Sequence, residues 1–427
     1  MNITDITTAA APPPGGWVRR PVIDNRSLEQ TVGAIIAEVR KDGDAAVRKY
    51  SLQFDKSAPA VFELDGEAIR AGAALVDPAL KAAIRVAAEH IRAFTLEQRS
   101  VEQVVETMPG VRCWRRSVAI EKVGLYIPGG TAPLFSTLLM LAIPAKIAGC
   151  REIVLCSPPD ARGQLHPAIL YAAELVGVTR IFRVGGVQAI AAMAFGTESI
   201  PAVYKIFGPG NQYVTCAKQL AQRDGLAIDM PAGPSEVAVL ADETADPDFV
   251  AADLLSQAEH GADSQVVLVS TSAAVVEQVL AEVARQAAIL PRAEIAYKAL
   301  EHSRAFVVRD VEQAMELLND YAPEHLILAC SEPERVAERV INAGSVFLGH
   351  YSPESVGDYA SGTNHVLPTN GHARAYSGVS LDSFVKKITF QQLSKEGLFA
   401  IGDTVRRMAA AEGLEAHARA VEVRMGG

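Results

Sequence analysis

Residues 152–156, Glu-Ile-Val-Leu-Cys, are the stretch that decides the fold class of this chain. The segment is mostly apolar on both faces and precedes a helical stretch, which is typical of a strand buried in a parallel sheet. The same pattern recurs at residues 180–184, 203–207, 236–240, 265–270, 325–329 and 345–348. Because helical stretches separate these candidate strands, we expect an α/β protein with parallel sheets.

The order of these segments predicts two Rossmann-like but incomplete α/β domains. The first combines residues 22–125 with residues 236–379, and the second comprises residues 126–235. An N-terminal arm, residues 1–21, precedes them and contains the run Ala-Ala-Ala-Pro-Pro-Pro-Gly-Gly. Residues 380–427 are expected to form a separate C-terminal helical tail.

Composition excludes several classes of partner. The net charge of −10 over 427 residues argues against nucleic acid and anionic membranes, because phosphate contacts need clustered lysine and arginine. The longest apolar stretch, about residues 134–143, is too short to span a bilayer. The amino terminus lacks a basic segment followed by an apolar core, so we expect no export signal. Five cysteines without a CxxC pair fit reduced thiols in a cytoplasmic protein.

Three glycine turns lie where candidate strands meet helices. They are Tyr126-Ile-Pro-Gly-Gly130, Val184-Gly-Gly-Val-Gln188 and Phe207-Gly-Pro-Gly-Asn211. Free N–H groups at a helix start can hold a pyrophosphate. None of the turns is a full GxGxxG, since Tyr213 stands where the third glycine of the last turn would fall. They are therefore either tight connections that need glycine for a positive φ, or parts of an incomplete dinucleotide site.

Gln257 and His260 suggest a metal site. They lie three residues apart at the end of a helix and so project from one face. A histidine just before a glycine cap also complements the helix dipole, and that is an alternative role for His260. Asp358 and His417 add further nitrogen and oxygen donors without a thiolate. Such a set is typical of a catalytic zinc site that keeps a position open for substrate.

Glu324 and His325 are candidates for proton transfer. They are adjacent at the start of a candidate strand, where neighbouring side chains diverge. We expect them to serve two different proton-transfer positions.

The chain resembles the histidinol dehydrogenase family. The resemblance runs from about residue 30 to residue 425, and several long motifs occur in the family's order. These motifs are Gln257-Ala-Glu-His260, Ala322-Pro-Glu-His325, Ser361-Gly-Thr-Asn-His-Val-Leu-Pro368, Gly208-Pro-Gly-Asn211 and Ala232-Gly-Pro-Ser-Glu236. One local departure is His350, where the family pattern favours proline or aspartate.

The resemblance implies a zinc- and NAD-dependent oxidation of L-histidinol through L-histidinaldehyde to L-histidine, the last steps of histidine biosynthesis. It implies one Zn²⁺ per subunit and a homodimer with shared active sites, in which the tail brings Glu412 and His417 to the partner's site. The domain of residues 126–235 would be the NAD side. By resemblance, the zinc ligands are Gln257, His260, Asp358 and His417, and the proton-transfer residues are Glu324 and His325. The resemblance also implies that Ser235, His365 and Glu412 contact the substrate. The NAD contacts it implies are Tyr126, Gln188 and Asn211.

Three alternatives remain at this point. A related zinc- and NAD-dependent dehydrogenase would act on another small alcohol, such as a sulfonated diol. A zinc hydrolase would use Glu324 to activate water. A cysteine nucleophile, as in aldehyde dehydrogenases, would require Cys150 or Cys156, but no positive group or helix start is evident beside either residue, so we expect both to be core thiols.

Overall fold

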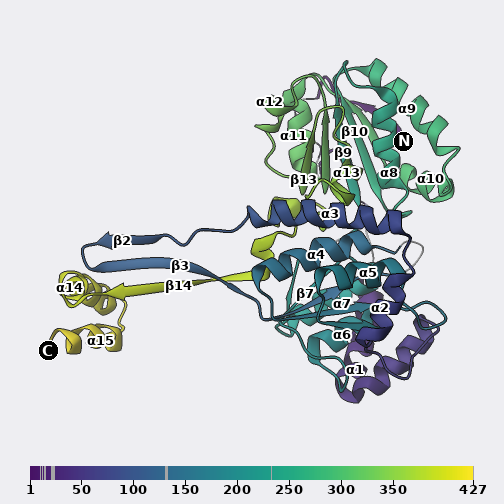
Figure 1. Cartoon of the computed structure of the whole chain (residues 1–427). Helices are drawn as coiled ribbons and strands as arrows, with labels where there is room; N and C mark the ends of the chain where they lie inside the picture. The colour runs from purple at the N-terminus through teal and green to yellow at the C-terminus, as the bar shows by residue number, and fades with distance from the viewer. Residues whose placement is uncertain are drawn as a thin grey trace.

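The computed structural model describes residues 1–9, 11, 13, 16–20, 25–129, 133–231 and 233–426. Two parallel sheets covered by helices dominate it, which confirms the α/β class. Figure 1 shows the sheets in separate lobes, with α3 (Pro78–Leu96) between them and a long arm leaving one side.

The first sheet has five parallel strands in the order β6-β5-β4-β7-β8. They are β4 (Lys122–Tyr126), β5 (Glu152–Ser157), β6 (Arg180–Arg183), β7 (Lys205–Phe207) and β8 (Ala227–Ile228). Successive side chains of β5 enter opposite hydrophobic clusters, as the period of a strand requires. One face carries α2 (Gly66–Ala74), α3, α4 (Phe135–Ala148) and α5 (Pro167–Val176), and the other α1 (Asn25–Phe54), α6 (Gly186–Phe195) and α7 (Gln212–Arg223).

The second sheet has six parallel strands in the order β1-β11-β10-β9-β12-β13. They are β1 (Asn2–Asp5), β9 (Glu236–Ala241), β10 (Gln265–Ser270), β11 (Arg304–Val307), β12 (His325–Ala329) and β13 (Ser345–Leu348). Helices α8 (Pro247–Ala258), α9 (Ala273–Ala287) and α10 (Ala293–His302) cover one face, and α11 (Val311–Tyr321) and α12 (Pro333–Ala337) the other. The short α13 (Glu354–Tyr359) and the 3₁₀ turns η1 (His372–Arg374) and η2 (Leu381–Phe384) follow.

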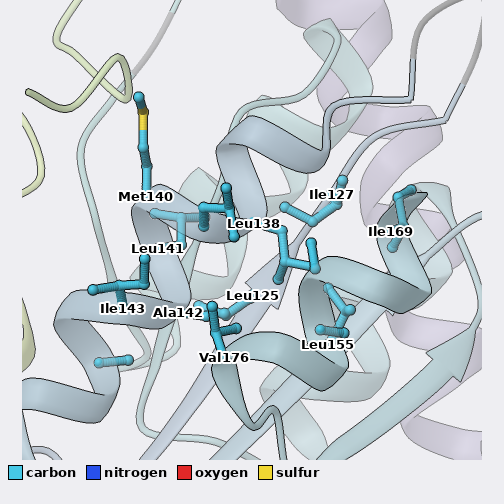
Figure 2. Packing of buried hydrophobic residues seen from close by; sticks show 14 of the residues in the cluster. Leu125, Ile127, Leu138, Met140, Leu141, Ala142, Ile143, Leu155, Ile169 and Val176 are labelled. Carbon is cyan, nitrogen blue, oxygen red and sulfur yellow. The ribbon is translucent and has the colours of Figure 1, made fainter. Parts of the chain in front are cut away.

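Helix α4 is apolar around its whole circumference because it lies inside the first lobe rather than on its surface. Figure 2 shows Leu138 among strand residues such as Leu125 and Leu155, whereas Met140 points away from them. This packing fixes the first turn of α4, which borders the candidate site. None of the helices in the described part of the chain has both the length and the apolar composition needed to cross a bilayer.

The tail prediction for residues 380–427 is correct only in part. Helices α14 (Lys395–Ala411) and α15 (Glu415–Met425) form as expected and lie at the end of the arm (Figure 1). Before them, β14 (Val385–Leu393) pairs antiparallel with β3 (Val111–Ala119), which also pairs with β2 (Val104–Met108). A stack of Trp114 on Phe390, with ring centroids 5.5 Å apart, joins β3 to β14. β14 forms because the distant strand β3 pairs with it, and the local periodicity of residues 385–393 does not reveal this pairing.

Two predicted boundaries also differ from the structure. Residues 2–5 of the expected arm form β1 at the edge of the six-stranded sheet, while residues 10, 12, 14, 15 and 21 lie outside the described residues. The sequence predicts that residues 22–125 belong to the same domain as residues 236–379. The helices of residues 25–96 instead pack on the five-stranded sheet. The reason is that the apolar face of α1, which includes Val32 and Val39, is buried together with residues of α6 and α7.

Candidate functional site

A cluster of polar residues lies at the amino edge of the six-stranded sheet. Strands β9 and β12 begin there side by side, with His325 paired in register to Val237. Helix α8 ends at the same edge, because the chain leaves it to enter β10. Helix α13 packs against α8 and brings a fourth segment to the cluster.

Glu324 and His325, at the start of β12, are both buried, but they do not diverge as the sequence predicted: Nδ1 of His325 lies 3.7 Å from Oε2 of Glu324, because both side chains contact the backbone of Glu236. Oε2 of Glu324 accepts a hydrogen bond from the backbone N–H of Glu236 at 2.9 Å. Nδ1 of His325 lies 3.0 Å from the carbonyl oxygen of the same residue. A carbonyl oxygen only accepts, so Nδ1 carries the proton. Nε2 of His325 has no hydrogen-bond partner among the described residues.

The electrostatics of this pair reflect burial among carboxylates. Burial raises the pKa of Glu324 to about 7, against the opposing effect of neighbouring His325. Burial alone would lower the pKa of His325, but the surrounding carboxylates outweigh it and raise this pKa to about 10. A divalent cation would offset that negative charge and return the imidazole toward its neutral form.

Three of the four residues expected to bind metal come together. Gln257 is 1% exposed, and its Oε1 has no hydrogen-bond partner in the described structure. Its Nε2 donates toward Oε2 of Glu324 at 3.4 Å, so Oε1 is the amide atom left for a ligand. Single ligand atoms of His260 and Asp358, together with one of Glu354, lie within 4.8 Å of one another. These nitrogen and oxygen donors, with an orphaned amide oxygen, fit a divalent cation such as zinc.

The pKa values of His260 and Asp358 also suit metal ligands. Burial of its ring lowers the pKa of His260, although Asp358 opposes the shift. Burial tends to raise the pKa of Asp358, but the contact with His325 outweighs burial and holds it below its usual range. His260 is therefore neutral and Asp358 ionised at neutral pH, the states in which each binds a metal.

The sequence did not identify Glu354. It lies four residues before Asp358, so the two carboxylates are one turn apart on α13. Glu354 is 1% exposed, and burial raises its pKa to about 8. The spacing of the two acids was a visible signal, but a six-residue helix lacks the length for a periodic pattern.

His417 and Glu412 do not join the cluster within this chain. His417 lies on α15, and Glu412 caps the end of α14, at the far end of the arm in Figure 1. Both residues are exposed.

His365 does reach the cluster. Its Nδ1 lies 4.0 Å from Oδ1 of Asp358, and its Nε2 lies 2.9 Å from Oγ1 of Thr137 on α4. Thr137 is a site residue that no pattern in the sequence indicated. Ser235 stands just before β9, next to Glu236, and its carbonyl oxygen accepts from the N–H of Gln265. Ala232 of the same motif lies outside the described residues.

A cavity of about 1880 Å³ opens at the carboxyl edge of the five-stranded sheet. Tyr126 and Asn211, two of the residues expected to contact NAD, line it. Pro133, just before α4 begins, also lines it, and Thr137 in the first turn of α4 contacts His365. The cavity and the polar cluster are therefore neighbours across the two lobes.

Gln188, the third residue expected to contact NAD, is fully buried. Its Nε2 donates to Oδ2 of Asp55 at 3.3 Å, and Asp55 lines the cavity. Burial raises the pKa of Asp55 to about 6, although bonds from Gly185 and Gln188 oppose the shift. Asp55 is a further residue that the sequence did not point to.

Several N–H groups at the last glycine turn already have partners, which favours the first of the two readings of this turn. Oδ1 of Asn211 accepts from the N–H groups of Tyr213 and Val214, both at 3.1 Å. The N–H of Gly208 donates to Asp229 at 2.8 Å. Gly208 has φ 126°, and a Cβ there would meet the carbonyl oxygen of Tyr126 at 2.0 Å. This turn is thus a tight connection in which close backbone approach requires glycine. Gly130, in the first turn, lies outside the described residues.

The cysteines offer no activated nucleophile. Burial raises the pKa of Cys150 to about 12, and it raises the pKa of fully buried Cys156 as well. Both residues are held as unreactive thiols, which argues against covalent cysteine catalysis.

Comparisons with known proteins point to one protein family. A family model described as histidinol dehydrogenase matches residues 18–425. Histidinol dehydrogenase of Bacteroides thetaiotaomicron is 61% identical over 96% of this chain and 95% of its own length. The Escherichia coli protein of the same name is 51% identical over 99% of this chain and 98% of its own length. A crystal structure of histidinol dehydrogenase from Elizabethkingia anophelis superposes with a TM-score of 0.96 at 52% identity, covering 100% of this chain and 98% of that one.

Proposed function

This chain belongs to the histidinol dehydrogenase family and oxidises L-histidinol in histidine biosynthesis, and we propose that it yields L-histidine through L-histidinaldehyde with one zinc ion per subunit and two NAD. The observation that carries the proposal is the orphaned Oε1 of Gln257 beside Glu324 and His325. A buried amide oxygen without a partner is costly unless a ligand satisfies it.

The proposed metal ligands are Gln257, His260 and Asp358 of one chain and His417 of the partner subunit. When bound, the zinc ion supplies a Lewis acid that holds the nitrogen atoms of histidinol and keeps its alcohol carbon in place. The neutral imidazole of His260 and the ionised carboxylate of Asp358 are ready for this role without losing a proton.

His325 removes the hydroxyl proton in the first oxidation. Its Nδ1 proton is tied to the carbonyl oxygen of Glu236, which leaves the Nε2 lone pair for the substrate. The cavity lined by Tyr126 and Asn211 would hold NAD, which would supply the acceptor for the hydride that leaves the same carbon. The products of this step are the aldehyde, a proton on His325 and reduced cofactor.

Glu324 acts in the second oxidation. With a pKa of about 7, it accepts a proton from water as that water adds to the aldehyde carbon. The hydrated aldehyde then loses a hydride to a second NAD and a second proton to the protein, which gives the carboxylate. Ser235 and His365 orient the substrate, together with Glu412 of the partner subunit, and retention of the reactive aldehyde at the site between the steps prevents side reactions.

We further propose a cytoplasmic homodimer. The arm carries His417 and Glu412 away from the chain's own cluster and exposes apolar side chains on α14 and α15. The exposed apolar residues are Phe399, Met408, Leu414 and Val423. A second copy that receives this arm would bury these side chains and gain the two polar ones. All five cysteines, which lie in the described parts of the chain, are free thiols, as a reducing compartment favours.

The stoichiometry of cofactor reduction tests the reaction. With limiting L-histidinol and excess NAD, we expect about two NADH per histidinol and L-histidine as product. A small sulfonated diol, the substrate of the rival dehydrogenase, should reduce little NAD under the same conditions. The proposal fails if the diol is oxidised while histidinol is inert, or if histidinol disappears without NADH, as a hydrolase would require.

A further inference from the structure

Glu354 is a buried acid that has no role in the proposed mechanism. It begins α13, one turn before Asp358, and is 1% exposed. Its Oε2 has no hydrogen-bond partner among the described residues. A buried carboxyl oxygen without a hydrogen-bond partner is costly unless a ligand such as a metal cation satisfies it.

The position of Glu354 identifies what that cation is. A ligand oxygen of Glu354, one of Asp358 and a ring nitrogen of His260 lie within 4.8 Å of one another. Two atoms bound to one ion at about 2.0–2.2 Å lie at most about 4.4 Å apart, so the three donors need to approach one another by no more than a few tenths of an ångström to share an ion. Glu354 therefore shares the ion of the proposed zinc site rather than marking a second site.

The position of the arm leaves the metal site of a single chain without one of its expected ligands. The fourth expected ligand, His417, lies on α15 at the far end of the arm. A single chain therefore offers Gln257, His260 and Asp358 but lacks a fourth protein donor from the expected set. Two carboxylates from one chain, Glu354 and Asp358, would also balance the charge of a divalent ion.

We propose that Glu354 is a metal ligand supplied by the same chain as His260 and Asp358, and that it holds the divalent ion in a subunit whose site lacks His417. The inference rests on the proposed zinc-dependent function. Its consequence is that zinc loading does not depend on the arm of the partner subunit.

Zinc affinity of the full-length protein tests the inference directly. Zinc is titrated into metal-free protein in competition with a chromophoric chelator, for wild type, His417→Ala, Glu354→Gln and the double variant. We expect His417→Ala to retain one zinc per chain, and the double variant to bind about tenfold or more weakly than His417→Ala. Glu277→Gln, which removes an exposed carboxylate on α9, is the matched control and should bind zinc as wild type does.

The possible outcomes separate this inference from the proposed function. Equal zinc affinity of the double variant and His417→Ala would overturn the role of Glu354, as would complete loss of zinc from His417→Ala alone. Wild-type protein that binds no zinc would instead overturn the zinc-dependent function. Glu354→Asp keeps the charge but shortens the side chain, and it should bind zinc with an affinity between those of wild type and Glu354→Gln. This variant also tests the inference if Glu354→Gln does not fold.

Discussion

The backbone N–H of Glu236 donates to Oε2 of Glu324 at 2.9 Å, and its carbonyl oxygen receives the Nδ1 proton of adjacent His325 at 3.0 Å. Both groups assigned to proton transfer are thus oriented by one residue at the start of β9. The pairing of β9 with β12 in the sheet fixes this arrangement. The geometry of the two side chains is a property of the strand register rather than of a mobile loop.

Glu324→Gln should separate the two oxidations. Glutamine has the same shape and still accepts the Glu236 N–H through its amide oxygen, but it cannot take a proton from water. We expect aldehyde oxidation to fall by about 10²–10⁴-fold and alcohol oxidation to fall much less. Rapid kinetics on histidinol and on histidinaldehyde measure each step. Equal losses in both would remove Glu324 from the second step.

Arg20→Met should destabilise the fold around the site. Arg20 pairs with buried Glu236 through Nε and Nη2, at 2.5 and 2.9 Å, so its loss leaves an uncompensated buried carboxylate. Such a loss costs about 3–5 kcal/mol, measurable as the free energy of unfolding in urea. Adding Glu236→Gln should restore part of the stability, because the unpaired charge is removed. If the double variant is no more stable than Arg20→Met, unpaired charge is not the cause.

Much of the site was predictable because its residues follow local rules. Gln257 lies near the end of α8 and His260 in the turn that follows it, so their closeness in sequence placed both at one edge of the sheet. Glu324 and His325 are adjacent at the start of a strand, although their side chains converge on Glu236 rather than diverge. Seven of the parallel strands were recognisable from apolar runs on both faces, but β4, at the centre of the five-stranded sheet, and β11 were not among the predicted segments.

Other features depend on partners far away in sequence. β14 was expected to be helical because its partner β3 lies about 270 residues earlier, as its register shows. Asp55 reaches the cavity only because the chain after α1 meets the turn at Gly185, and burial there raises its pKa. Glu354 sits on a helix too short to show a period. In each case long-range packing supplied information that no local window contains.

Asp55 should make stability depend on pH. Burial raises its pKa from 3.8 to about 6 in the folded chain, so folding favours the protonated form. Its contribution is fully present below about pH 4 and is lost as pH rises through about 6. Asp55→Asn should therefore be more stable than wild type at pH 7–8 by about 2 kcal/mol, after allowance for partial exposure, and show no such gain at pH 4. Urea unfolding across this range checks the sign, and a gain that is the same at both pH values would contradict the assignment.

Mixed dimers test whether the arm acts on the partner subunit. His417→Ala and Glu324→Gln chains should each be nearly inactive alone. If the sites are shared, a mixed dimer contains one site with both native residues, so random mixing should restore about a quarter of wild-type activity. If His417 acts within its own chain, both sites of the mixed dimer are defective and mixing should restore nothing. Refolding the two variants together, followed by an assay of L-histidine formation, which needs both oxidations, distinguishes these outcomes.

Metal dependence is the most direct test of the account. Protein freed of divalent ions by chelation and dialysis should fail to form NADH from L-histidinol, because the alcohol is no longer held beside His325. Activity should return in proportion to added zinc and reach its plateau at about one ion per chain. Undiminished NADH formation by the metal-free protein would contradict the central claim.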